Sequence, residues 1–242
     1  MNITVSQYIK QKNRLFEGAR IASIKLKEIE DVVIHSNPSF FGNAFHIALE
    51  YAFYQKGYSN AFEPNITRVC HNNGLLEDVM DKIKRKHPLS IENLVLLTKG
   101  EQYYRSAYST MEITEKEMEA MKRDEVLINE RVNWVLGKQE AWETLVVAPT
   151  FDLNSVGLRG DGDFIEKGVL YEVKCVKDSK ISSRTQKQLM LYYLLNEERK
   201  HIGQESYEIK QFGYINPLRK EWVIWDIEIP SEVKNNWKAR KI

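Results

Sequence analysis

Acidic, basic and apolar side chains alternate within residues 160–174, in the stretch GDGDFIEKGVLYEVK. Residues 169–176 are typical of a β-strand, in which alternate side chains share one face of the sheet. Glu172 and Lys174 then point the same way, roughly 7 Å apart at the usual rise of a strand. A turn at 166–168 folds the preceding strand back and brings Asp163 near that face. The sequence therefore predicts a group of two carboxylates and one amine.

Such a group has a clear chemical use. Two neighbouring carboxylates repel each other unless a cation lies between them, and oxygen ligands with remaining water positions suit Mg²⁺ or Mn²⁺. A nearby lysine can orient a water molecule and stabilise negative charge that develops on a phosphate. The group is therefore suited to phosphodiester hydrolysis. The stretch taken alone favours a different interpretation, a solvated hairpin, because a chain with 29% charged residues produces such patterns by chance.

Two further motifs favour the active-site interpretation over the solvated hairpin. Gly160-x-x-Asp163 followed by Glu172-Val173-Lys174 resembles the core of the PD-(D/E)XK nuclease superfamily in its RecB-like form. That branch also carries Gln-x-x-x-Tyr on the following helix, where this chain has Gln188 and Tyr192 four residues apart on one helical face. The upstream sequence GNAFHIALE, residues 42–50, resembles the Gly-x-x-x-His-x-x-x-Glu helix of the same branch.

The resemblance implies a role for each matched residue. The implied metal ligands are His46, Asp163, Glu172 and Val173. Lys174 is expected to position the attacking water, and Gln188 with Tyr192 to support Lys174 or the scissile phosphate. Glu50 is left open between orienting His46, contacting the metal shell and forming a surface pair. Asp161 is an alternative to Asp163, but the Gly160-x-x-Asp pattern and the spacing to Glu172 favour Asp163.

The resemblance further implies a Mg²⁺- or Mn²⁺-dependent deoxyribonuclease, with an exonuclease in recombination, repair or replication as the expected activity. Single- or double-stranded DNA is the expected substrate; a recombinase, a single-strand-binding protein or a helicase are the candidate protein partners. Two rivals stay open: a catalytically silent nuclease-fold subunit for DNA binding or assembly, and a non-nuclease metalloprotein that matches by chance. The sequence does not distinguish RNA from DNA, because no motif recognises the sugar.

Some accessories of related nucleases are not expected. Several relatives carry an iron–sulfur cluster on four cysteines, whereas this chain has two, Cys70 and Cys175, which we expect to be free thiols. Cys70-His71 has no companion pair at zinc spacing. No phosphate-binding loop of a helicase motor is present. The basic runs at 82–87 and 234–241 could contact DNA phosphates, but the favoured interpretation is that they are solvated faces.

The expected fold class is α/β (α+β), and the resemblance implies a restriction-endonuclease-like core with a mixed central β-sheet flanked by helices. A helical first half is expected: one or two amphipathic helices within 5–30, then helices at about 42–55, 75–86 and 114–136. Strands are expected at 145–147, 156–165, 169–176, 208–215 and 222–229. Helices are expected at 184–196, with Ser182-Ser183 as the cap, and at 231–242. We expect one domain over 1–242, with a catalytic core at about 40–56 and 140–228 and a helical insertion at about 57–139.

Composition agrees with a folded enzyme. At 242 residues and 43% hydrophobic content the chain can bury a sizeable core. The net charge of +1 argues against a histone-like polyanion binder but leaves room for a local basic groove. No signal peptide or long apolar run is recognised, so we expect no membrane contact and a cytoplasmic location, in a bacterial or virus-infected bacterial cell.

Overall fold

A computed structural model describes residues 3–10, 14–27, 32–59, 62, 77–105 and 112–239. Its centre is a mixed five-stranded sheet in the order β3-β5-β6-β8-β9. The strands are β3 (Val146–Val147), β5 (Phe164–Glu166), β6 (Val169–Val173), β8 (Gln211–Asn216) and β9 (Glu221–Asp226). β6 and β8 are parallel, whereas the other neighbouring pairs are antiparallel. Helix α7 (Ser183–His201) lies between β6 and β8 in the chain, as a parallel pair requires a long crossover.

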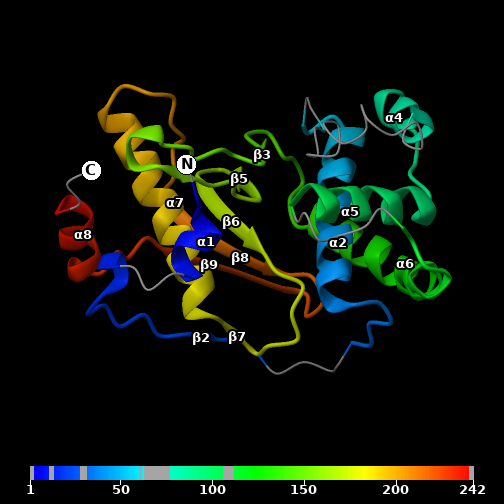
Figure 1. The fold of residues 1–242 in the computed structure, drawn as a ribbon, viewed down its shortest axis with the longest axis horizontal. Coiled ribbons are helices and arrows are strands. Elements are labelled where there is room, and N and C mark those ends of the chain that lie inside the picture. Colours follow the sequence, from blue (N-terminus) through cyan, green and yellow to red (C-terminus); the bar gives the residue numbers. More distant parts are fainter. Residues whose placement is uncertain are drawn as a thin grey trace.

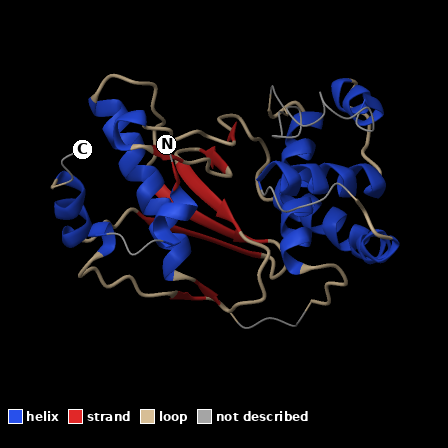
Figure 2. Cartoon of the chain, in the orientation of Figure 1, coloured by secondary structure: helices blue, strands red, loops and turns tan. Residues whose placement is uncertain are grey.

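Helices cover both faces of this sheet (Figures 1 and 2). On one face, α2 (Pro38–Gln55), α5 (Ile91–Arg105) and α6 (Glu115–Leu136) share a hydrophobic core with Phe164, Tyr171 and Val173. On the other face, α1 (Val5–Lys10), α7 and α8 (Ser231–Lys238) share a second core with Ile165, Leu170 and Phe212. The alternation of these sheet residues follows from the two-residue period of a strand.

The hairpin between β5 and β6 is as short as a hairpin can be. Its loop consists of Lys167 and Gly168, whose φ angles are 50° and 75°. Two successive positive φ angles are the mark of a turn whose twist matches that of paired strands, and glycine adopts such an angle without strain. The turn predicted at 166–168 is therefore confirmed, and it fixes the register Phe164↔Tyr171.

Local signals explain where the long helices begin. The side chain of Asn37 accepts hydrogen bonds from the amides of Ser39 and Phe40, so α2 starts at Pro38. The Asn37-Pro38 pair therefore opens the helix four residues before the expected start at Gly42. Thr114 and Glu117 form a reciprocal capping box at the start of α6. Ser182 caps α7 through the amide of Thr185, as predicted.

The structure differs from the sequence-based expectation in three places. Of the one or two amphipathic helices expected within 5–30, the described residues form only the short α1, which is followed by a 3₁₀ turn η1 (Arg14–Phe16) and strand β2 (Ile24–Lys25). β2 pairs with β7 (Lys180–Ile181), a contact between distant segments that overrides the local amphipathic pattern. The expected strand 156–165 is divided into η3 (Asn154–Val156), β4 (Leu158–Arg159) and β5, because β4 pairs instead with β1 (Ile3–Thr4).

The third error is an omission: the apolar pattern did not predict α5, which is surrounded by other helices and carries no single apolar stripe. The remaining expected helices at 75–86 and 231–242 are present as α4 (Glu77–Lys84) and α8. The structure thus confirms a mixed α and β fold with a mixed central sheet flanked by helices. None of the helices in the described ranges has the length and apolar content needed to span a membrane.

Candidate active site

Asp163 and Glu172 lie side by side at one end of the β5–β6 hairpin. The register Phe164↔Tyr171, continued by one residue, sets Asp163 opposite Glu172. Directly opposed residues have their Cβ atoms about 5 Å apart on the same face of an antiparallel pair. Oδ2 of Asp163 also accepts a hydrogen bond from the amide of Val173 at 2.5 Å. The expected approach of the two carboxylates is therefore built into the hairpin.

Lys174 follows directly after β6 and its Nζ contacts Oε1 of Glu172. The Glu172 side chain is 1% exposed, and burial raises its pKa to about 7, partly offset by the charge of Lys174 and increased further by Asp163. Burial alone lowers the pKa of Lys174, but the charges of Glu172 and Asp163 outweigh it and raise the net pKa above the ordinary value. Lys174 is therefore a cation at neutral pH, held beside a carboxyl that is shielded from water.

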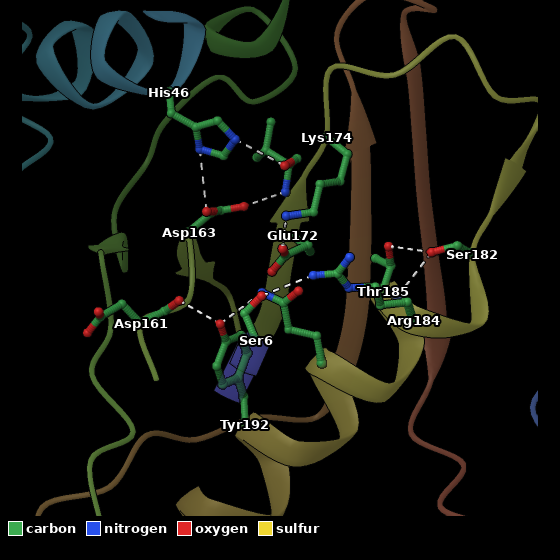
Figure 3. A network of polar contacts seen from close by, with 12 residues as sticks. Ser6, His46, Asp161, Asp163, Glu172, Lys174, Ser182, Arg184, Thr185 and Tyr192 are labelled. Atoms are coloured by element: carbon green, nitrogen blue, oxygen red, sulfur yellow. Dashed lines mark hydrogen bonds and ion pairs between the residues drawn. The ribbon is translucent and has the colours of Figure 1, made fainter. Parts of the chain in front are cut away.

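His46 reaches this group from α2, which packs on the face of the sheet opposite to α7 (Figure 3). Its Nε2 lies 3.1 Å from the carbonyl oxygen of Val173, which can only accept, so Nε2 donates. Its Nδ1 lies 3.4 Å from Oδ1 of Asp163. The imidazole thus contacts a carboxylate and a main-chain carbonyl of the group at the same time.

The position of α2, and with it of His46, depends on a buried carboxylate in α6. Asp124 is 1% exposed and accepts from the amides of His35 and Ser36, each at 2.9 Å, and from the Ser36 hydroxyl. These bonds fix the segment that leads into α2. No sequence pattern indicated this role for Asp124, because an acidic residue in a charged helix is usually solvated.

Gln188 and Tyr192 lie one turn apart on α7, as expected, but they contact a different part of the site. The Tyr192 hydroxyl donates to the carbonyl oxygen of Asp161 at 2.8 Å and accepts from Nε2 of Gln188 at 2.9 Å. Burial raises the pKa of Tyr192 well above its ordinary value. Tyr192 therefore stays protonated and anchors the chain two residues before Asp163.

Gly160 allows this anchor. A Cβ atom at Gly160 would lie 2.5 Å from Cε1 of Tyr192 and 2.9 Å from Cγ2 of Val5, which is closer than atoms pack. The side chain of Asp161, by contrast, is exposed and points away from Asp163 in Figure 3. The geometry therefore places Asp163, and not Asp161, beside Glu172 and Lys174.

Arg184 is a residue that the motifs did not single out. It extends from the first turn of α7 toward the group (Figure 3) and donates to Oγ of Ser6 at 3.2 Å. Its charge also lies close enough to Lys174 to oppose the rise in the pKa of that amine that Glu172 and Asp163 cause. Its position two residues after the cap Ser182, and four before Gln188, was a signal available in the sequence.

The donors suit a hard divalent cation in kind. Glu172 and Asp163 offer carboxylate oxygens, the Val173 carbonyl faces the same place, and His46 offers a ring nitrogen. Neither Glu172 oxygen has a hydrogen-bond partner within the described ranges beyond the ion-pair contact with Lys174. No three His, Cys, Asp or Glu side chains of the described residues are gathered closely enough to hold an ion as they stand.

Cys175 is a buried free thiol, and burial raises its pKa above the ordinary value. Cys70 and His71 lie outside the described residues. Glu50 follows His46 by one turn on α2 and is half-buried.

Comparison with known proteins does not assign the chain to a group. No protein-family model, no curated protein and no solved structure matches it. A functional conclusion must therefore come from the site itself.

Proposed function

We propose that the protein is a metal-dependent nuclease with a restriction-endonuclease-like core of the RecB-like kind, and that DNA is its substrate. One observation carries the proposal: Asp163, Glu172 and Lys174 meet at one end of a hairpin, and His46 reaches them from a helix more than 100 positions earlier in the chain. Chance matches on solvated surfaces are not expected to bring such distant groups together in a partly buried place.

In this proposal each residue of the site has a separate role in metal binding or catalysis. Asp163, Glu172, the Val173 carbonyl and His46 would hold Mg²⁺ or Mn²⁺, which when bound supplies positive charge beside the scissile phosphate. The Lys174 ammonium, held by Glu172, is placed to hydrogen-bond an attacking water and to offset charge that develops on the phosphate oxygens. Tyr192 holds the segment that carries Asp163, and Arg184 adds a second cation beside the amine.

A cleavage assay tests this proposal. The purified protein is incubated with linear and circular DNA, single- and double-stranded, with Mg²⁺, with Mn²⁺ or with EDTA. We expect cation-dependent cleavage that Asp163→Asn and Lys174→Gln each reduce by at least about a hundredfold, since each removes a charge at the reacting phosphate. Cleavage of linear but not circular DNA would indicate an exonuclease.

Asp161→Asn is the matched control, because it makes the same chemical change two residues from Asp163 on a side chain that points away from the group. We expect it to retain cleavage within about twofold to threefold. If no DNA is cleaved under any condition, or if Asp163→Asn and Asp161→Asn behave alike, the nuclease proposal is wrong. DNA binding without any cleavage would instead favour a catalytically silent subunit.

Anomalous scattering from a crystal soaked in Mn²⁺ tests the ligand set separately. We expect a peak between Asp163 and Glu172, with the imidazole of His46 rotated away from the Val173 carbonyl. A peak that touches neither carboxylate would refute the metal assignment.

A further inference from the structure

A short two-stranded ribbon beside the site carries an unusual arrangement of charge. In the antiparallel pair β2–β7, Ile24 lies opposite Ile181, and Lys25 lies opposite Lys180. The isoleucine pair faces inward, with Ile181 fully buried, whereas both lysines are exposed. Two lysine side chains therefore leave the ribbon from directly opposed positions on its outer face.

This arrangement costs stability unless an anion is nearby, because like charges directly opposite each other in a sheet repel. Lys27 and Lys177 flank the pair and are also exposed. Asp178 is the acidic residue in the loop that connects β6 to β7. Within the described ranges, no carboxylate lies in ion-pair distance of these four lysines. The ribbon therefore presents concentrated positive charge without a counter-charge from the described part of the protein.

Hydrogen bonds attach the backbone of the ribbon to the rest of the fold, so the positions from which its lysine side chains extend are defined. Nε2 of Gln186 donates to the carbonyl oxygen of Ala22 at 2.5 Å, and the amide of Leu26 donates to the carbonyl oxygen of Ser179 at 2.9 Å. Arg219, which is buried and paired with Glu221 at 3.0 Å, donates to the carbonyl oxygens of Lys27 and Lys177. One buried guanidinium thus fastens both strands of the ribbon to the turn between β8 and β9.

The ribbon also continues directly into the site. Lys180 follows Lys174 by six residues, and Ser182 then opens α7, whose first turn carries Arg184. Arg184 extends toward Glu172 and Lys174 (Figure 3), and the chain runs from Lys180 in β7 to Arg184 within four residues. Arg184 therefore links the basic ribbon to the amine at the site. The basic runs at 82–87 do not offer this continuity: Arg85 pairs with Asp81, and Lys86 lies over the ring of Tyr54.

We propose that Lys25 and Lys180, with Arg184 between them and the site, bind the phosphodiester backbone of the nucleic-acid strand on one side of the scissile phosphate. The identity of the substrate rests on the proposed nuclease function. Evenly spaced phosphates would supply the counter-charge that the described part of the chain does not provide at the ribbon, and lysine contacts to phosphate carry no sequence preference. The ribbon would therefore hold the strand in register without selecting its sequence.

Equilibrium binding in EDTA tests the ribbon without cleavage. Anisotropy of a fluorescein-labelled single strand of about 20 nucleotides is measured between about 50 and 200 mM KCl. We expect Lys25→Gln/Lys180→Gln to weaken binding about tenfold and to reduce the slope of log K against log salt by about 1.4, or about 0.7 for each lost phosphate contact. Lys25→Arg/Lys180→Arg keeps both charges and should bind as the wild type does.

A second double variant controls for net charge. Lys116→Gln/Lys200→Gln removes the same two charges from exposed positions on α6 and at the far end of α7, and we expect its affinity to stay within about twofold of wild type. Thermal melts check that each variant is folded. The ribbon proposal is overturned if the wild type does not bind the strand, if Lys25→Gln/Lys180→Gln binds with unchanged affinity and slope, or if the control loses as much.

These outcomes are separate from those of the nuclease assay. Cleavage by the wild type with unchanged binding by Lys25→Gln/Lys180→Gln would refute the ribbon and leave the nuclease proposal standing. Ribbon-dependent binding by a protein that cleaves no DNA would support binding at the ribbon and refute the nuclease proposal.

Discussion

Gly160 is the residue whose replacement tests most directly how the site is built. Its backbone lies against the ring of Tyr192, and an added Cβ would approach Cε1 and Cδ1 of that ring to 2.5 and 2.9 Å and Cγ2 of Val5 to 2.9 Å. Tyr192 has little room to move, because its ring stacks on Phe151 at 5.0 Å and its hydroxyl is bonded to the Asp161 carbonyl. We therefore expect Gly160→Ala to displace the chain that leads to Asp163.

The expected cost follows from overpacking alone. The φ angle of Gly160 is not in the positive range that disfavours alanine, so no backbone penalty is added. Inserting one methyl group into a close-packed site costs about 1–3 kcal/mol, and we expect the upper end because two rigid neighbours oppose it. At about 2–4 °C per kcal/mol for a chain of this size, the melting temperature should fall by about 6–12 °C.

Thermal and urea melts measure this effect, and two variants make the comparison specific. Gly42→Ala adds the same methyl group inside α2, where the nearest atom is Cβ of Cys175 at an ordinary 3.9 Å, so it should be neutral or stabilise the fold by up to about 1 kcal/mol. In a Tyr192→Ala background the cost of Gly160→Ala should shrink to about 1 kcal/mol, since Val5 alone opposes it.

The reasoning is refuted if Gly160→Ala melts within about 1 °C of wild type. It is also refuted if the cost of Gly160→Ala is undiminished in the Tyr192→Ala background. In either case the close approach of Gly160 to the ring does not constrain the site.

Three further predictions follow from buried or capping groups. Burial raises the pKa of Glu166, so the folded protein keeps a proton that the unfolded chain releases, and the free energy of unfolding falls as pH rises above the ordinary carboxyl range. Glu166→Gln should remove this fall, and it should raise the melting temperature by about 2–4 °C at neutral pH but not at acidic pH. Equal changes in melting temperature at neutral and acidic pH would contradict this prediction. Arg219→Met should destabilise the fold by about 3–5 kcal/mol in urea melts, because it leaves Glu221 buried without its partner. Arg219→Met/Glu221→Leu should recover part of that loss, and no recovery would exclude the ion pair as the cause. Ser182→Ala should cost about 1 kcal/mol through the lost cap of α7, whereas Ser183→Ala, one residue later, should change stability by less than about 0.5 kcal/mol.

Several parts of the fold could be read from local patterns. Lys167-Gly168 between two apolar runs predicted the hairpin, because few turns join paired strands and glycine is suited to them. Ser182 predicted the start of α7, because an N-cap acts through amides two or three residues away. Strand parity predicted that Glu172 and Lys174 share a face, and their side chains are in contact. Each of these signals acts over a few residues.

The errors lie where distant segments compete with local preference. The amphipathic pattern of residues 14–27 is that of a helix, yet Ile24 and Lys25 pair with β7 about 150 positions later. Leu158 and Arg159 pair with β1, which breaks the expected strand at 156–165. A backbone that gains hydrogen bonds and burial with a distant partner need not adopt its locally preferred form.

By itself, the sequence determined which side chains share a face and therefore that a carboxylate and an amine would stand together at 172 and 174. The turn at 166–168 also indicated that Asp163 approaches this face. Only the tertiary structure decided that His46 arrives there from α2, and that the Tyr192 hydroxyl binds the carbonyl of Asp161 and does not contact Lys174. It alone placed Lys25 opposite Lys180. The physical reason is that alternation along a strand is fixed by local backbone geometry, whereas the meeting of distant groups depends on the register and packing of the whole chain.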